Sequence, residues 1–161
     1  MKYLKIGTIV NTHALKGEVR IISNFEYKDR VFIVGNKLYI GHSYIPEEIE
    51  TYRVHKQFDM VKFKGIDYIN DVLKYKGCYV YIDEESLSLK DDEILESEFT
   101  SYELYSNDKL IGHIEEYRND NGNKIIKVNS KYLPYNKDFI SKIDKTNKRI
   151  YMHGIEVFLW K

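Results

Sequence analysis

The sequence predicts a mainly β protein built from two small β-barrels. Its 161 residues include 15 Tyr and 7 Phe, which favour pleated strands, and short apolar runs lie between turn-forming Gly, Asn and Asp. With 43% hydrophobic residues, the chain can bury two small cores. We place an N-terminal barrel over residues 1–84, an acidic linker over residues 85–98 and a C-terminal barrel over residues 99–161, and no fixed-period repeat relates the two halves.

The N-terminal barrel is predicted to open with a glycine-hinged hairpin. Residues 6–10 and 19–22 alternate as strand residues do, and a polar loop lies between them. Gly17 can adopt the positive φ that the turn needs. The returning strand should then direct its charged side chains to one face and its apolar side chains to the other.

The other predicted elements of this half complete a barrel with a helix at one end. Asp67 can cap a helix that Gly77 ends. The strand patterns lie at residues 36–41, 48–56, 60–64 and 78–82.

The C-terminal half shows a second series of strands. The turns at Asn107-Asp108 and Asn121-Gly122 are typical of hairpins. A helical turn is expected over residues 139–143, and the tail over residues 155–160 should fold back as a lid. Strands are predicted around residues 102–104 and over 110–117, 124–129, 131–134 and 149–152.

Charge is balanced overall but unevenly distributed. The 25 basic and 25 acidic residues give a formal net charge of zero, which argues against coating of nucleic acid by bulk electrostatics. Residues 83–98 nevertheless hold eight acids and one base, whereas residues 118–153 hold nine bases and three acids. The simplest interpretation of both segments is solvated surface.

Several chemical classes find no support in the sequence. Cys78 is the only cysteine, so an internal disulfide is impossible, and we expect it in a buried strand. The five histidines lack metal-site spacing, and phosphate-binding loops and nucleophile elbows are absent. No apolar run reaches the roughly 20 residues of a membrane span. We therefore expect a cytoplasmic monomer without metal, cofactor, catalytic residue or membrane partner.

The opening segment, Gly7 to Arg20, closely resembles the N-terminal signature of the RimM family, bacterial factors for maturation of the small ribosomal subunit. Ala14 stands where that family usually has glycine. Further short matches occur in the family's order and spacing, at Val54-His55-Lys56, Gly65-Ile66, Lys76-Gly77, Asp92-Glu93, Ile111-Gly112-His113-Ile114, Leu133-Pro134-Tyr135, Ile143-Asp144 and Lys148-Arg149-Ile150. The resemblance implies an N-terminal barrel similar to those of translation factors and reductases, followed by a PRC-type barrel.

Two groups of residues are candidates for recognition. Basic and loop residues of the first barrel can present donors to an RNA phosphate backbone: His13, Lys16, Gly17, Arg20, Arg53, His55 and Lys56. In the second half, aromatic and apolar residues beside lysines suit a ribosomal protein or RNA, although Leu133 is also expected to be buried in the core: Lys131, Tyr132, Leu133, Pro134 and Tyr135. The family's paired tyrosines after the acidic linker, implicated in ribosomal contact, correspond to Ile94 and Leu95.

The resemblance implies a non-enzymatic assembly factor that binds immature small ribosomal subunits at the head region. Its expected partners are a head ribosomal protein and the 3′ domain of the small-subunit rRNA, and its expected effect is promotion of maturation and rRNA processing. A flavin-binding reductase-like barrel is the alternative, because similar small barrels occur in flavin reductases. A third possibility is an interaction module with no ribosomal role.

Overall fold

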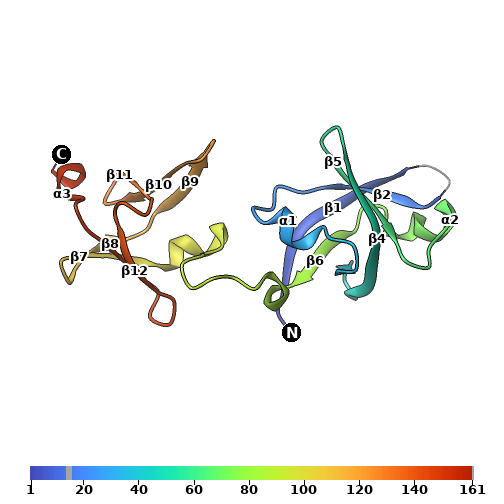
Figure 1. Ribbon diagram of the computed structural model, residues 1–161, viewed down its shortest axis with the longest axis horizontal. Coiled ribbons are helices and arrows are strands. Elements are labelled where there is room, and N and C mark those ends of the chain that lie inside the picture. Colours follow the sequence, from blue (N-terminus) through green and yellow to red (C-terminus); the bar gives the residue numbers. More distant parts are fainter. Residues whose placement is uncertain (14–15, 161) are drawn as a thin grey trace. The chain divides into compact units, whose positions relative to one another are not determined.

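The computed structural model describes residues 1–13 and 16–160, which form two compact units, Met1–Ser88 and Leu89–Lys161 (Figure 1). Both units consist mainly of strands, which confirms the predicted fold class. The acidic segment predicted as a separate linker is divided between the units after Ser88. Within the described ranges, no helix combines the length and the apolar character that crossing a membrane requires.

Six antiparallel strands close the barrel of the first unit, in the order β1-β2-β5-β4-β3-β6. Val19 and Ile21 are fully buried, while the charged residues between and before them are partly exposed, so the predicted opening hairpin is confirmed. The strand bounds are β1 (Tyr3–His13), β2 (Glu18–Ile22), β3 (Lys37–Ile40), β4 (Ile45–His55), β5 (Phe58–Phe63) and β6 (Tyr79–Asp83).

Two register shifts interrupt the predicted alternation in β1. One lies between Lys5 and Gly7 against β6, and the other lies between Ile9 and Asn11 against β2. Gly7 permits a close approach of β1 to β2, since a Cβ there would lie 2.7 Å from the carbonyl oxygen of Ile22. Such bulges bend a strand and increase its twist, which helps a small sheet to close into a barrel.

A short helix that the sequence did not predict, α1 (Lys28–Val31), is attached to the barrel through a buried carboxylate. Asp59 of β5 is 2% exposed, and its Oδ2 lies 2.8 Å from Nζ of Lys28. The hydroxyl of Tyr52 donates to Oδ1 of Asp59 over 2.6 Å, and burial together with this bond raises the pKa of Tyr52. A buried charge needs such partners, so these contacts fix α1 against β4 and β5.

The predicted helix near residue 70 is present but short. It consists of α2 (Ile69–Val72) and a 3-10 helix (Leu73–Tyr75), and Gly77 with a φ of +86° follows it. Asp67 does not cap this helix, because its Oδ1 instead accepts a bond from Nζ of Lys62 over 2.9 Å. Cys78 is only partly buried and precedes β6, so its predicted place within a buried strand is wrong.

The second unit contains two sheets and a C-terminal helix, α3 (Glu156–Leu159). One sheet has the order β11-β10-β9 and the other has the order β12-β13-β7-β8. All neighbouring strands are antiparallel except β13 and β7, which are parallel. The bounds are β7 (Glu103–Ser106), β8 (Lys109–His113), β9 (Glu116–Asp120), β10 (Asn123–Val128), β11 (Lys131–Pro134), β12 (Ile140–Asp144) and β13 (Arg149–Met152).

Both predicted hairpin turns are confirmed by positive φ values, 52° and 60° at Asn107 and Asp108 and 52° and 93° at Asn121 and Gly122. The single strand predicted over residues 110–117 is wrong, because β8 joins one sheet and β9 joins the other. The predicted helical turn over residues 139–143 is also wrong. Pairing with β13 there extends the backbone into β12.

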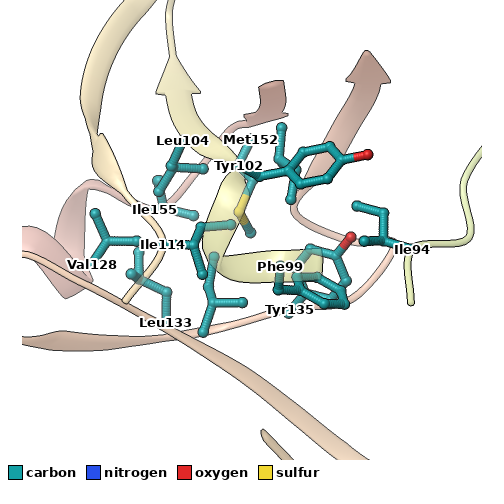
Figure 2. Packing of buried hydrophobic residues seen from close by; sticks show 12 residues of the cluster. Ile94, Phe99, Tyr102, Leu104, Ile114, Val128, Leu133, Tyr135, Met152 and Ile155 are labelled. Atoms are coloured by element: carbon teal, nitrogen blue, oxygen red, sulfur yellow. The ribbon is translucent and has the colours of Figure 1, made fainter. Parts of the chain in front are cut away.

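Twelve buried residues form the core of the second unit, and Figure 2 shows Ile94 among them. Ile94 is 6% exposed and Leu95 is 2% exposed, and 3-10 helices cover Glu84–Leu87 and Glu96–Ser101. The expectation of a wholly solvated acidic segment is therefore wrong. The core residues are Ile94, Phe99, Tyr102, Leu104, Ile114, Ile126, Val128, Leu133, Tyr135, Ile150, Met152 and Ile155.

Candidate functional site

The barrel of the first unit brings four of the predicted RNA-binding residues together on the three strands β1, β2 and β4. His13 lies at the end of β1, Arg20 on β2, and Arg53 and His55 at the end of β4. Together with Glu18 of β2 they form what we call the basic cluster. The imidazole rings of His13 and His55 lie 6.0 Å apart between centroids, although 42 positions separate them in the sequence.

Cross-strand register explains how this cluster forms. Met60 of β5 pairs with Arg20 of β2 on one side and with Arg53 of β4 on the other. Residues in one cross-strand row share a face of a sheet, so the two arginine side chains flank Met60. Met60 is fully buried there. The aliphatic parts of long basic side chains commonly cover apolar surface in this way while their charged ends stay in water.

The polar contacts of the cluster fix its two arginines differently. Nη2 of Arg20 donates to Nδ1 of His13 over 2.6 Å, and a guanidinium has only donors, so Nδ1 accepts. Arg53 binds Glu18 with two bonds, from Nε over 3.0 Å and from Nη2 over 2.8 Å. Its guanidinium lowers the pKa of Glu18, and in return Glu18 raises the pKa of Arg53. Arg53 thus remains charged and oriented on the surface.

The remaining candidates of the first unit lie at the two hairpin ends. Lys16 and Lys56 are exposed, and Lys56 adopts a left-handed φ of 56° in the turn between β4 and β5. Gly17 is buried with a φ of +86°, as predicted, and a Cβ there would lie 3.1 Å from the carbonyl oxygen of Ile66. Gly17 therefore shapes the loop instead of presenting a side chain. Ala14 lies outside the described residues.

Four of the seven residues predicted to bind a ribosomal protein belong to the interior. Leu133 is fully buried, Tyr135 is 7% exposed, and Ile94 and Leu95 are also buried. Figure 2 shows Leu133, Tyr135 and Ile94 within the hydrophobic cluster. Direct contact of these four side chains with a partner would require opening of the core.

Tyr132 is the exposed aromatic residue among the seven residues predicted to bind a ribosomal protein. Its side chain is 46% exposed, and two cations lie near its ring, with Cζ of Arg118 5.2 Å and Nζ of Lys127 5.5 Å from the ring centroid. Lys131 donates to the backbone carbonyl of Leu159, the last residue of α3, and Pro134 ends β11 half-buried. Tyr132, Lys131, Pro134, Arg118 and Lys127 are called here the Tyr132 surface.

Some residues of both surfaces were not singled out from the sequence. Phe58 lies under the basic cluster, with its ring centroid 5.4 Å from Cζ of Arg20. Lys127 lies between the buried residues Ile126 and Val128 of β10, and this alternation indicates that its side chain points outward. The place of Glu18 beside Arg53 had no such signal, because 35 positions separate the two residues.

The described residues include no group of three or more His, Cys, Asp or Glu that could hold a metal ion. The surfaces consist instead of arginine, lysine and aromatic side chains on two small β units. The fold and these surfaces define a protein of two β units, the first a closed barrel, with chemistry suited to macromolecular recognition.

Comparison with known proteins gives the family. Residues 4–87 match the model of the RimM N-terminal domain. Ribosome maturation factor RimM of Streptococcus mutans is 39% identical over 160 residues, with 93% of each chain covered, and that of Staphylococcus haemolyticus is 37% identical, with 97% and 98% covered. The chain belongs to the RimM family, and the resemblance noted in the sequence is confirmed.

A solved structure supports the same fold. The chain is similar to a RimM from Pseudomonas aeruginosa, described as a 16S ribosomal RNA processing protein, with a TM-score of 0.50 and 18% identity. That similarity covers 98% of this chain and 100% of the other. At this identity the comparison supports the architecture of both units, and the family's name indicates a role in ribosome maturation.

Proposed function

We propose that this protein binds immature small ribosomal subunits at the head and promotes their maturation and rRNA processing without catalysing a covalent step. The observation that carries the proposal is similarity along nearly the whole chain to relatives named ribosome maturation factors. The proposed partners are the 3′ domain of the small-subunit rRNA and a ribosomal protein of the head. We further propose that the protein acts in the cytoplasm as a monomer.

The basic cluster supports contact with rRNA through phosphates. Arg53 and Arg20 are held by Glu18 and His13, so the cluster loses little side-chain freedom when it binds. Lys16 and Lys56 add exposed ammonium groups at the hairpin ends. Phosphate contacts of this kind position a protein on RNA without reading its sequence.

The Tyr132 surface supports contact with a ribosomal protein. Tyrosine and arginine are enriched among residues that dominate protein interfaces, and Tyr132 combines an exposed ring with Arg118 beside it. Pro134 adds a rigid apolar neighbour at the end of β11. In this proposal Ile94 and Leu95 support the surface from the core and do not touch the partner.

An assembly factor of this kind works by differential affinity. Its binding free energy shifts the precursor toward the conformation that it binds best, and it leaves when mature contacts replace its own. The protein needs no cofactor or nucleotide for this cycle. It needs tighter binding to the immature subunit than to the mature one.

Sedimentation of cell extract tests the proposal. We expect the protein with free small subunits and their precursors, and deletion of its gene should slow the accumulation of mature small subunits. A protein found mainly on translating ribosomes would overturn the assembly role. The flavin alternative predicts visible absorption in the purified protein, and a colourless protein that co-sediments with precursors would exclude it.

A further inference from the structure

A second aromatic surface lies on the outer face of the four-stranded sheet of the second unit. Leu104, Ile150 and Met152 point into the core from β7 and β13, so the residues that alternate with them face outward. Tyr105 and Tyr151 are two of these residues, and both are partly exposed. Neither belongs to the basic cluster or to the Tyr132 surface.

Register places these residues in one row across the sheet. Lys142 of β12 pairs with Tyr151 of β13, Tyr151 pairs with Tyr105 of β7, and Tyr105 pairs with Leu110 of β8. The two tyrosine rings lie 5.4 Å apart between centroids, and Leu110 is 53% exposed at the end of the row. At about 4.8 Å between strands, this row extends over roughly 14 Å, enough for about two nucleotides.

Each ring of the row has a cation above or beside it. Cζ of Arg149 lies 4.8 Å from the ring centroid of Tyr105, and Nζ of Lys142 lies 5.9 Å from that of Tyr151. A bond with the Tyr151 hydroxyl raises the pKa of Arg149, which keeps the guanidinium charged on this face. A guanidinium plane and an aromatic ring both serve as stacking partners for bases.

This face carries acidic as well as basic side chains. Glu103 pairs in register with Arg149, and Asp144 accepts bonds from the backbone and side chain of Asn147 over 3.1 and 2.9 Å, which hold its carboxylate toward its own turn. Against these two acids, the same face carries two bases, Lys142 and Arg149, so the face is balanced in charge and its cations lie beside the two rings. Cations at these places can each meet a phosphate of a strand whose bases stack on the rings.

We infer that the row of Lys142, Tyr151, Tyr105 and Leu110, with Arg149 above it, binds single-stranded RNA by base stacking. The inference rests on the proposed role with precursor rRNA and adds a stacking contact from the second unit. RNA is favoured over a protein partner because this row offers two rings 5.4 Å apart with cations beside them, on which successive bases can stack, whereas the Tyr132 surface has a single ring. Paired RNA fits less well because its bases are already stacked within the helix.

The test uses the full chain and a fluorescent RNA decamer of mixed sequence that forms no hairpin. Fluorescence anisotropy should show binding of the decamer and much weaker binding of a duplex of equal length. Replacement of Tyr105 or Tyr151 by Leu, which keeps bulk but removes the aromatic face, should weaken binding of the decamer about ten-fold each. The matched control is Tyr79→Leu in the first unit, which also removes an exposed ring with a cation beside it, Nζ of Lys5 at 3.6 Å from the ring centroid, and should leave this affinity unchanged.

A second measurement identifies the residues that the RNA contacts, which distinguishes binding of the decamer by the row of tyrosines from binding by the basic cluster. A decamer containing 4-thiouridine, irradiated with the full chain, should become attached to peptides that contain Tyr105 or Tyr151. Lys142→Gln, an exposed change that leaves the core intact, should lower the slope of log affinity against log salt by about 0.7.

The outcomes separate this inference from the proposed function. Unchanged decamer affinity in folded Tyr105→Leu and Tyr151→Leu proteins, or cross-links confined to the first unit, would overturn the stacking surface while precursor binding stands. Loss of precursor binding in Tyr151→Leu without decamer binding by the wild type would assign the face to a protein partner and also overturn it. Decamer binding without any association with precursors would instead count against the proposed function.

Discussion

Nη2 of Arg20 lies 2.6 Å from Nδ1 of His13, and this bond joins the two strands of the first hairpin beside the buried Met60. Arg20 is therefore both a surface cation and part of the cover over an apolar residue. Its removal should affect stability as well as recognition, unlike the removal of an exposed lysine.

Arg20→Ala should lower the free energy of unfolding of the first unit by about 1 to 2 kcal/mol, because it removes a hydrogen bond and uncovers Met60. Urea denaturation followed by circular dichroism measures the loss. Arg20→Lys keeps the stem and the charge and should restore part of the stability. An Arg20→Ala protein as stable as the wild type would show that the Arg20 side chain does not cover Met60.

Exposed lysines should behave in the opposite way. Lys16→Gln combined with Lys56→Gln should change stability by no more than about 0.5 kcal/mol but weaken co-sedimentation with precursor subunits. The salt dependence of that binding should also become less steep, since two phosphate contacts are lost. Lys37→Gln on β3 is the control. An equal loss of binding in that variant would show that Lys16 and Lys56 have no specific role in binding the precursor.

The pairing of Glu18 with Arg53 predicts a pH dependence of stability. The bonds from Arg53 lower the pKa of Glu18 in the folded protein, so its contribution is complete above the unfolded pKa of about 4.3 and is lost as the pH falls through the folded value. The stability difference between wild type and Glu18→Gln should stay constant from about pH 7 to 5 and shrink between about pH 4 and 3. A difference that persists unchanged at pH 3 would contradict the ion pair.

Gly7→Ala should be strongly destabilising, because the added Cβ would lie 2.7 Å from the carbonyl oxygen of Ile22 and would separate β1 from β2. We expect a loss of about 2 kcal/mol or more, of the size that strain at a close contact produces. Gly35→Ala is the matched control: it has a φ of +92° but no atom within 4 Å of the added Cβ, and should cost about 1 kcal/mol. Thermal unfolding of both variants compares the two, and equal costs would show that the backbone at Gly7 can move aside.

Ile94→Ala tests the assignment of that residue to the core. Truncation of a buried isoleucine typically costs about 2 to 5 kcal/mol, so the second unit should unfold at lower urea concentration while the first unit is unaffected. Near-ultraviolet circular dichroism and limited proteolysis distinguish the units. Normal stability with lost subunit binding would instead make Ile94 a contact residue.

Local patterns predicted much of the fold. The first hairpin, the Asn-Gly and Asn-Asp turns and the strand that Pro134 ends follow from alternation and turn chemistry, which act between close neighbours. The residues around 140 were predicted as helix because their apolar spacing fits one turn, yet pairing with β13 makes them a strand. No pattern in the sequence indicated α1, because its attachment depends on Asp59, which lies 31 positions beyond Lys28.

The candidate sites also depend on contacts between residues far apart in the sequence, which local patterns do not reveal. Residue types indicated that His13, Arg20, Arg53 and His55 are available for recognition, but only the barrel register brings the two histidine rings together and places the two arginines beside Met60. In the second unit, aromatic and apolar residues next to lysines were expected at one surface. Alternation within β11 separates them, so that Tyr132 is exposed while Leu133 is buried.

Closure of the first barrel depends on strands from its two sequence ends, because β1 pairs with β6 between Tyr3 and Asp83. During synthesis, the edge of β1 that pairs with β6 is therefore covered only after residues near position 83 have left the exit tunnel. Pairing over such a sequence separation slows folding. From Ser88 onward, however, none of the chain is needed to complete this barrel. The N-terminal unit can thus fold while the rest of the polypeptide is still being translated, and β13, which pairs with β7 across more than forty residues, is the last strand to be added.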